Sequence, residues 1–126
     1  MPTQSESGIG FDASGSICDA AQNIRTVVRT EKDVTAIGDT ELVPAQGAGI
    51  RIRVLALFYN SATAVALRLK SAGNNISASF SLGINGDIVL PYLPHGWFQT
   101  NPNEALNANQ SLAVTSGAQV IWIPTT

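Results

Sequence analysis

The sequence consists largely of short segments in which apolar and polar residues alternate, with turn-forming residues about every ten positions. Ile50–Val54 reads Ile-Arg-Ile-Arg-Val, so its aliphatic side chains face one way and its arginines the other. Ile76–Leu82 alternates serine with Ile, Ala, Phe and Leu. Gly83–Asp87 is turn-forming and contains an Asn-Gly pair, which favours a hairpin. Since no window has the 3.6-residue apolar period of a capped helix, this pattern restricts the chain to an antiparallel all-β fold.

We predict strands from Ile24 onward. Leu55–Tyr59 is apolar at every position, so this strand is expected to be covered on both faces. About eight short strands in roughly 100 residues favour a jelly-roll-like antiparallel β-sandwich, with an up-and-down barrel as the alternative. The predicted strands are 24–29, 40–44, 50–59, 65–70, 76–82, 88–90, 97–100, 111–115 and 119–123.

The first 23 residues differ in composition from the rest of the chain. They are mostly small and polar, with isolated apolar residues that follow no period, including Ile9, Phe11 and Ile17. We predict an extended N-terminal arm over residues 1–23 and one sandwich domain over residues 24–126. Ile9, Phe11 and Ile17 are candidate anchors on another surface, and a loose terminus is the alternative. The segment lacks the basic and apolar regions of a signal peptide, so we expect synthesis in a cytosol without secretion.

Charge is sparse and unevenly distributed. Charged residues make up 13% of the chain, with seven basic and nine acidic residues, which argues against a nucleic-acid or membrane-surface binder and against disorder. All the lysines and arginines lie at or before Lys70, and Asp87 and Glu104 are the only acids after it. A half-chain with so few charges is expected to present much of its surface to another protein.

The sequence offers little catalytic or metal-binding chemistry. Cys18 and His95 are the only residues of their types, which excludes an intrachain disulfide and Cys- or His-rich metal sites. His95 follows Pro94 and precedes Gly96, with no nucleophile or carboxylate beside it. We therefore expect a protein that is not an enzyme and has no cofactor or metal.

Four cations are expected to face outward from consecutive strands. If these strands pair as a hairpin, like charges share one sheet face and require an acidic group nearby. That group is either Glu31 or Asp33 of the same chain, or an acidic surface of a neighbouring subunit or partner protein. The four residues are Arg51, Arg53, Arg68 and Lys70.

Two adjacent pairs of large apolar residues, Trp97-Phe98 and Ile121-Trp122, lie in predicted strands. Because neighbouring side chains of a strand point to opposite faces, one residue of each pair is expected in the core. The outward partners are expected to form an apolar surface patch that marks a protein contact.

The stretch Ile52–Pro124 resembles small jelly-roll proteins of tailed bacteriophages. The resemblance lies in a strand that ends Leu57-Phe58-Tyr59-Asn60 and a second that reads Ile88-Val89-Leu90-Pro91. These are followed by Gly96-Trp97-Phe98-Gln99-Thr100, then Asn103-Glu104-Ala105-Leu106-Asn107 and a final pair of strands around Gly117. Asn103 stands where glycine is common. Proteins of this kind decorate or cement capsids, and some occur in tails, usually as trimers.

The resemblance implies a homotrimeric virion structural protein that binds the major capsid protein on the outer capsid surface. Each subunit of a cyclic trimer offers two different patches, and the charge-poor half is expected to line the threefold axis. The alternatives are a lectin-like carbohydrate-binding module, with Trp97 or Trp122 stacked on a sugar, or a tail-fibre or baseplate module. The expected subunit contacts are Tyr92, Trp97, Phe98 and Trp122, and the expected capsid contacts are Ile9, Phe11, Ile17, Arg51 and Arg53.

Overall fold

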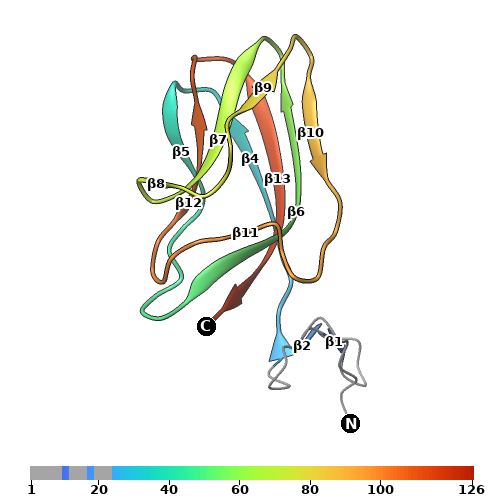
Figure 1. The fold of residues 1–126 in the computed structure, drawn as a ribbon, viewed down its shortest axis with the longest axis vertical. Helices are drawn as coiled ribbons and strands as arrows, with labels where there is room; N and C mark the ends of the chain where they lie inside the picture. Colours follow the sequence, from blue (N-terminus) through green and yellow to red (C-terminus); the bar gives the residue numbers. More distant parts are fainter. Residues whose placement is uncertain (1–9, 12–16, 19–23) are drawn as a thin grey trace.

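The computed structural model describes residues 10–11, 17–18 and 24–126, and this part of the chain contains strands and loops but no helix. Two antiparallel sheets pack on each other, which confirms the predicted β-sandwich (Figure 1). The strands are β1 (Gly10–Phe11), β2 (Ile17–Cys18), β3 (Ile24–Arg25), β4 (Val28–Val34), β5 (Gly38–Val43), β6 (Arg51–Ser61), β7 (Val65–Ser71), β8 (Asn74–Asn75), β9 (Phe80–Leu82), β10 (Asp87–Leu90), β11 (Phe98–Gln99), β12 (Leu106–Gln110) and β13 (Ser116–Thr125).

The sandwich has the strand order of a jelly roll. The sheet that we call the β6 sheet has the order β10-β6-β13-β4, with β11 also paired to β6. The β7 sheet has the order β5-β12-β7-β8, with β9 also paired to β7. Early strands pair with late ones: β4 with β13, β5 with β12, β6 with β10 and β7 with β9. This is the pairing of an antiparallel ribbon that is rolled into two sheets. The barrel alternative is wrong, because strands consecutive in sequence from β4 to β7 alternate between the sheets.

A β-bulge divides the long central strand β6. Ile121 of β13 pairs with Ala56 and Trp122 with Val54, so Leu55 is an extra residue on β6. The bulge changes the phase of the alternation: Val54 joins the main core, whereas Leu55 packs with Ile123 in a second buried cluster. The apolar run of the sequence thus fills two clusters on opposite sides of the sheet.

The main core lies between the two sheets. Its fully buried side chains alternate with outward-facing ones along each strand, as the burial of every second residue of β7 illustrates. Each fully buried Leu or Ile side chain contributes about 1.5–3 kcal/mol through removal of its surface from water. Representative members are Ile52, Leu57, Leu67, Leu69 and Leu106.

Three sequence predictions on local structure are wrong. Residues 111–115, predicted as a strand, form the loop between β12 and β13, and β12 occupies the preceding residues Leu106–Gln110. Only Phe80–Leu82 of the alternating stretch 76–82 forms a strand. The Asn-Gly turn at Asn85 joins β9 of one sheet to β10 of the other, so it turns the chain without making a hairpin. In each case the secondary structure depends on pairing with a strand that is distant in sequence, which local pattern does not reveal.

The segment around Ile24 does not form one strand of the sandwich as predicted. β3 pairs with β2, and β2 pairs with β1, in a small antiparallel sheet of its own. The sandwich itself begins at β4. Of the predicted arm over residues 1–23, the stretches 1–9, 12–16 and 19–23 lie outside the described residues.

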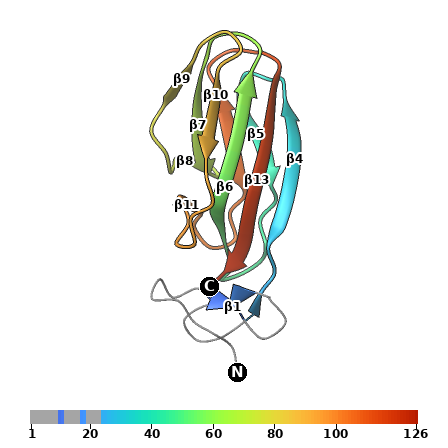
Figure 2. The same ribbon diagram turned by 90° about the vertical axis from the view of Figure 1, so that its right-hand side faces the viewer.

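Four loops meet at the end of the sandwich opposite the C-terminus, which we call the distal end (Figure 2). They are residues 35–37, 62–64, 83–86 and 111–115, and none of these residues is charged. The Ala62 amide donates to the Thr115 carbonyl at 3.0 Å, and the Asn85 amide donates to the Ala62 carbonyl at 3.4 Å. These bonds join three of the loops into one hydrogen-bonded layer.

Candidate interaction surfaces

The two sheets present outer faces of different chemistry. On the β6 sheet, Phe58 is 43% exposed and its cross-strand partner Val89 on β10 is 60% exposed. Ala56 and Ile121, which pair with each other, adjoin them, and these residues line a shallow hollow of about 140 Å³. We call Ala56, Phe58, Val89 and Ile121 the apolar patch. A contiguous apolar area on an exposed sheet face is typical of a surface that contacts another protein.

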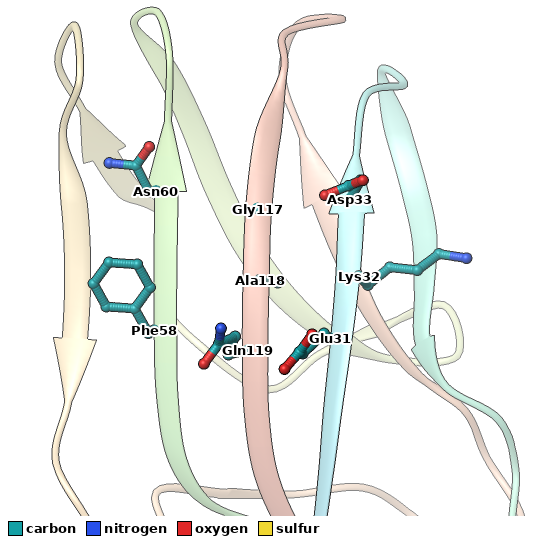
Figure 3. A pocket seen from close by; sticks show the side chains of 8 residues that line it. All are labelled: Glu31, Lys32, Asp33, Phe58, Asn60, Gly117, Ala118 and Gln119. Atoms are coloured by element: carbon teal, nitrogen blue, oxygen red, sulfur yellow. The ribbon is translucent and has the colours of Figure 1, made fainter.

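A second hollow adjoins the apolar patch on the same face. It has a volume of about 220 Å³ and lies over Gly117, whose lack of a side chain opens the space between β6 and β4. Figure 3 shows Phe58 and Asn60 on one side of this hollow, Glu31 and Asp33 on the other, with Gln119 between them and Lys32 pointing away. Glu31 forms an ion pair with Arg29 at 3.1 Å, and both side chains are largely exposed. The apolar patch is therefore bordered by an acidic edge.

The outer face of the β7 sheet is polar. Asp39 accepts a hydrogen bond from Asn109 Nδ2 at 2.7 Å and lies 3.6 Å from Lys70 Nζ. Arg68 pairs across the ladder with Asn109, and Glu41 of β5 pairs with Asn107. The alternation that buries the inner residues of β7 and β12 thus leaves charged and amide side chains outside.

The loop 91–97 between β10 and β11 presents two of the four aromatic side chains expected at subunit contacts. Tyr92 is 48% exposed. Trp97 is 38% exposed, and its indole Nε1 donates to the Pro91 carbonyl at 2.7 Å, which fixes the ring within the loop. The Leu93 amide donates to the Leu55 carbonyl at 2.9 Å and the Trp97 amide to the Val54 carbonyl at 2.7 Å. These bonds hold the loop against β6, so both aromatic side chains are presented by a braced segment.

Gly96 explains how closely this loop approaches β6. Its φ is +82°, and a Cβ at this position would lie 2.5 Å from Cγ of Arg53. Arg53 Nε in turn donates to Gln99 Oε1 at 3.0 Å. Arg53, predicted as a capsid contact, therefore lies along the loop and supports it. Arg51 is half-buried on the same face of β6.

The other two aromatic side chains expected at subunit contacts turn toward the core, and the burial of Trp122 corrects the prediction for that residue. Trp122 is 5% exposed and packs in the main core, where its Nε1 lies 3.0 Å from Thr30 Oγ1, so it neither contacts another subunit nor stacks on a sugar. Phe98 is partly buried and packs against the same core. The alternation rule correctly places one residue of each pair inside: Phe98 and Trp122 face the core, and Trp97 and Ile121 face outward.

The expectation that four cations share a sheet face is wrong. β6 and β7 belong to different sheets, so Arg51 and Arg53 lie on one side of the sandwich and Arg68 and Lys70 on the other. The acidic partner of Lys70 is Asp39, which the sequence prediction did not include.

The charge-poor half of the sequence does not form one face of the molecule. Strands β10, β11 and β13 of that half belong to the β6 sheet, and β8, β9 and β12 to the β7 sheet. A jelly roll interleaves the halves because late strands pair with early ones. The uncharged surface is instead the distal end, where Ile37, Ile84 and Leu112 are 64%, 75% and 53% exposed.

The predicted arm contacts are only partly described. Ile9 lies outside the described residues. Phe11 on β1 pairs with Ile17 on β2 in the small N-terminal sheet. This sheet lies near the end of the sandwich that carries the C-terminus (Figure 2).

Phe58 and Val89 are surface residues that the sequence pattern does not predict. The apolar run Leu55–Tyr59 was expected to be covered on both faces, yet Phe58 is exposed on the outer face. The run itself contains the relevant information, because a strand that is apolar on both faces needs a covering layer on each. In the sandwich, the opposite sheet covers the inner face of the strand.

Two polar groups of the described residues have clearly shifted pKa values. Burial raises the pKa of Tyr59 to about 12. Hydrogen bonds from Ser71 Oγ at 2.7 Å and Asn101 Nδ2 at 3.0 Å lower the pKa of Glu104. Both groups serve the fold: Tyr59 lies between the sheets, and Glu104 ties the end of β7 to the loop before β12.

Within the described part of the chain, no group of three or more His, Cys, Asp or Glu side chains is arranged to hold a metal ion. The same part has no helix that could span a membrane. No protein-family model matches the chain, and a search of curated proteins finds no match. The function must therefore be inferred from the surfaces themselves.

Proposed function

We propose that the protein is a non-enzymatic structural protein of a tailed-phage virion, a homotrimer that decorates the capsid and stabilises it. The observation that carries this proposal is the unequal chemistry of the two outer sheet faces. One face is polar and hydrogen-bonded, whereas the other exposes Phe58 and Val89 side by side. Exposed apolar pairs of this kind favour association with another protein surface.

Self-association accounts for the position of these residues. In a cyclic trimer, each subunit contributes two different patches that meet head to tail. The apolar patch supplies one of them. The loop 91–97 at the β10 edge, with Tyr92 and Trp97 exposed on a braced backbone, supplies the other. Aromatic side chains on a rigid segment lose little conformational entropy on binding, so they suit the centre of an interface.

The capsid-binding role is assigned to the N-terminal arm. The resemblance to phage jelly-roll proteins covers Ile52–Pro124 and leaves the arm free for an additional contact. Each trimer would present three arms to the major capsid protein, and three linked contacts bind far more tightly than one. Arm residues Ile9, Phe11 and Ile17 are the proposed anchors, and stabilisation would follow from bridging neighbouring capsid subunits.

The oligomeric state tests the first half of this proposal. Sedimentation equilibrium at micromolar concentration should give three times the mass of one chain. Replacing Phe58 and Val89 together by serine should give a folded monomer, because the loss of two exposed apolar side chains removes interface area without opening the core. The matched control replaces Ile37 and Ile84 by serine; these residues lie at the distal end and are more exposed than Phe58 and Val89, and the variant should remain trimeric. A wild-type chain that sediments as a monomer would refute the trimer.

Co-sedimentation with capsid shells tests the second half. The shells should be assembled from the major capsid protein of the phage that encodes this chain. The wild-type protein should pellet with them and raise their disassembly temperature. A trimer that leaves the shells unbound and their stability unchanged would refute the decoration role while leaving the trimer intact.

A further inference from the structure

The polar outer face of the β7 sheet contains a groove of about 390 Å³. Its walls carry two cationic, two amide and two hydroxyl side chains: Arg68, Lys70, Asn75, Asn109, Ser79 and Ser111. Ala66 is the one apolar residue that lines it. The groove lies on the opposite side of the sandwich from the apolar patch, so it stays open when that patch is covered.

Arg68 is the unusual residue of this groove. Its Nε is buried and has no hydrogen-bond partner within the part of the chain that the structure describes. Buried donors are almost always paired, since an unpaired one has lost its hydration without compensation. Among the described residues Arg68 has no ion pair, whereas the neighbouring cation Lys70 lies against Asp39. Asp39 also accepts a hydrogen bond from Asn109, so this carboxylate is already engaged by two other residues.

The remaining walls can hydrogen-bond to hydroxyl groups. Ser111 Oγ accepts a hydrogen bond from the Ala66 amide at 2.9 Å, which leaves its hydroxyl hydrogen free to donate into the groove. Asn75 and Ser79 are exposed at the other side. Side-chain amides and hydroxyls both donate and accept, which matches the alternating requirements of a polyhydroxylated ligand.

We propose that this groove binds a saccharide that carries a carboxylate, such as an oligomer of a hexuronic acid, with the carboxylate held by the Arg68 guanidinium. The planar guanidinium of Arg68, which lines the groove, matches a carboxylate with two parallel hydrogen bonds from its terminal nitrogens. The sugar hydroxyls contact Asn75, Ser79, Asn109 and Ser111.

An acidic peptide fits this groove less well. Peptide recognition commonly uses an open strand edge or pockets for apolar side chains. β7 is an interior strand, paired with β12 on one side and with β8 and β9 on the other. The groove also lacks apolar pockets, since Ala66 is its one apolar residue. This inference does not depend on the capsid role.

Titration with trigalacturonic acid, followed by amide NMR shifts at low ionic strength, tests the proposal. The shifts should be confined to residues of the groove walls, and neutral trigalactose and acetate should each bind at least about tenfold more weakly, because each lacks one half of the recognised chemistry. Arg68→Gln should weaken trigalacturonate binding by about tenfold or more. Arg29→Gln, which removes an exposed arginine from the opposite face, should leave it unchanged.

Two further variants keep the test decisive if Arg68→Gln does not fold. Arg68→Lys keeps the charge but loses the planar guanidinium and should still weaken binding. Asn75→Ala lies at an exposed site and should weaken binding without affecting the fold. Equal binding of trigalacturonate and acetate would overturn the saccharide assignment, and shifts that map to the loop 91–97 would overturn the groove. An acidic peptide that binds more tightly than trigalacturonate would also overturn the proposal.

Discussion

Tyr59 on β6 donates its hydroxyl hydrogen to Oε1 of Gln110 on β12 at 2.7 Å, so one buried hydrogen bond joins the two sheets through the core. Ser116 Oγ donates to the same oxygen at 2.6 Å. The amide nitrogen of Gln110 donates to the Ala36 and Val114 carbonyls, both at 3.2 Å. One side chain therefore ties together both sheets and two loops of the distal end.

Replacing Gln110 by leucine should be much more harmful than replacing Tyr59 by phenylalanine. Gln110→Leu leaves two buried hydroxyls and two carbonyls without their partner, and we expect a loss of about 3 kcal/mol in the free energy of unfolding. Tyr59→Phe removes one donor while Ser116 still bonds the Gln110 oxygen, so about 1 kcal/mol should be lost. Urea denaturation measures both. Tyr92→Phe, at an exposed site, is the control, and equal losses for the two core variants would contradict the network.

The raised pKa of Tyr59 predicts a loss of stability at high pH. Its pKa is about 12 in the folded chain, compared with 10.0 for the unperturbed group. Between these values the unfolded chain releases the phenolic proton while the folded chain keeps it, so stability falls as pH rises, by about 1.4 kcal/mol per pH unit for this group. Urea denaturation at pH 9 and pH 11 should reveal this fall. Tyr59→Phe should reduce it, and an unchanged pH dependence in that variant would assign the effect to other groups.

The lowered pKa of Glu104 predicts a loss of stability at low pH. Its carboxylate accepts hydrogen bonds from Ser71 and Asn101, so the pKa of this carboxyl lies below its ordinary value in the folded chain. That contribution is present above the unfolded pKa and is lost as pH falls through the folded one. Glu104→Gln should therefore flatten the decline of thermal stability below about pH 4.5. Glu41→Gln, an exposed carboxylate on β5, should keep the wild-type profile.

Gly96 should tolerate no side chain. Gly96→Ala combines a φ of +82° with a Cβ 2.5 Å from Arg53 Cγ, so the loop 91–97 must move away from β6. We expect a loss of at least about 1 kcal/mol in the free energy of unfolding. Under the proposed function, the trimer should also weaken, because Tyr92 and Trp97 move with the loop. Gly73→Ala, where no atom lies near the added Cβ, is the matched control.

The sequence predicts the fold where local pattern and pairing agree. The alternation of Ile50–Val54 appears as buried and half-buried residues of β6, and the left-handed φ of +56° at Asn103 accounts for asparagine where the resemblance leads one to expect glycine. β12 was missed because its inward residues are Leu106, Ala108 and Gln110, and a buried glutamine breaks the apolar pattern. That glutamine is buried because Tyr59, far away in sequence, supplies its partner.

The interaction surfaces were harder to predict for the same reason. Trp122 is predicted as a contact residue because tryptophan is common in interfaces. The alternation of side chains along β13, however, points it into the core. Phe58 lies in an apolar run whose outward residues can be identified only when the bulge at Leu55 is known. Arg68 is separated from Arg53 by the crossing from one sheet to the other, which local sequence does not indicate.

Under the proposed function, assembly of the trimer and attachment to the capsid depend on different residues. Replacing Ile9, Phe11 and Ile17 together by serine should leave the sedimenting mass and the unfolding temperature unchanged, because the sandwich begins at β4 and its core is built from later residues. Co-sedimentation with capsid shells should be lost, since polar side chains cannot bury apolar area against the shell.

The control replaces Ile84 by serine at the distal end and should keep full binding. Deletion of residues 1–23 should behave like the triple variant. Full capsid binding by either arm variant would exclude the arm as the attachment site and turn attention to the uncharged distal end, where Ile37, Ile84 and Leu112 are exposed.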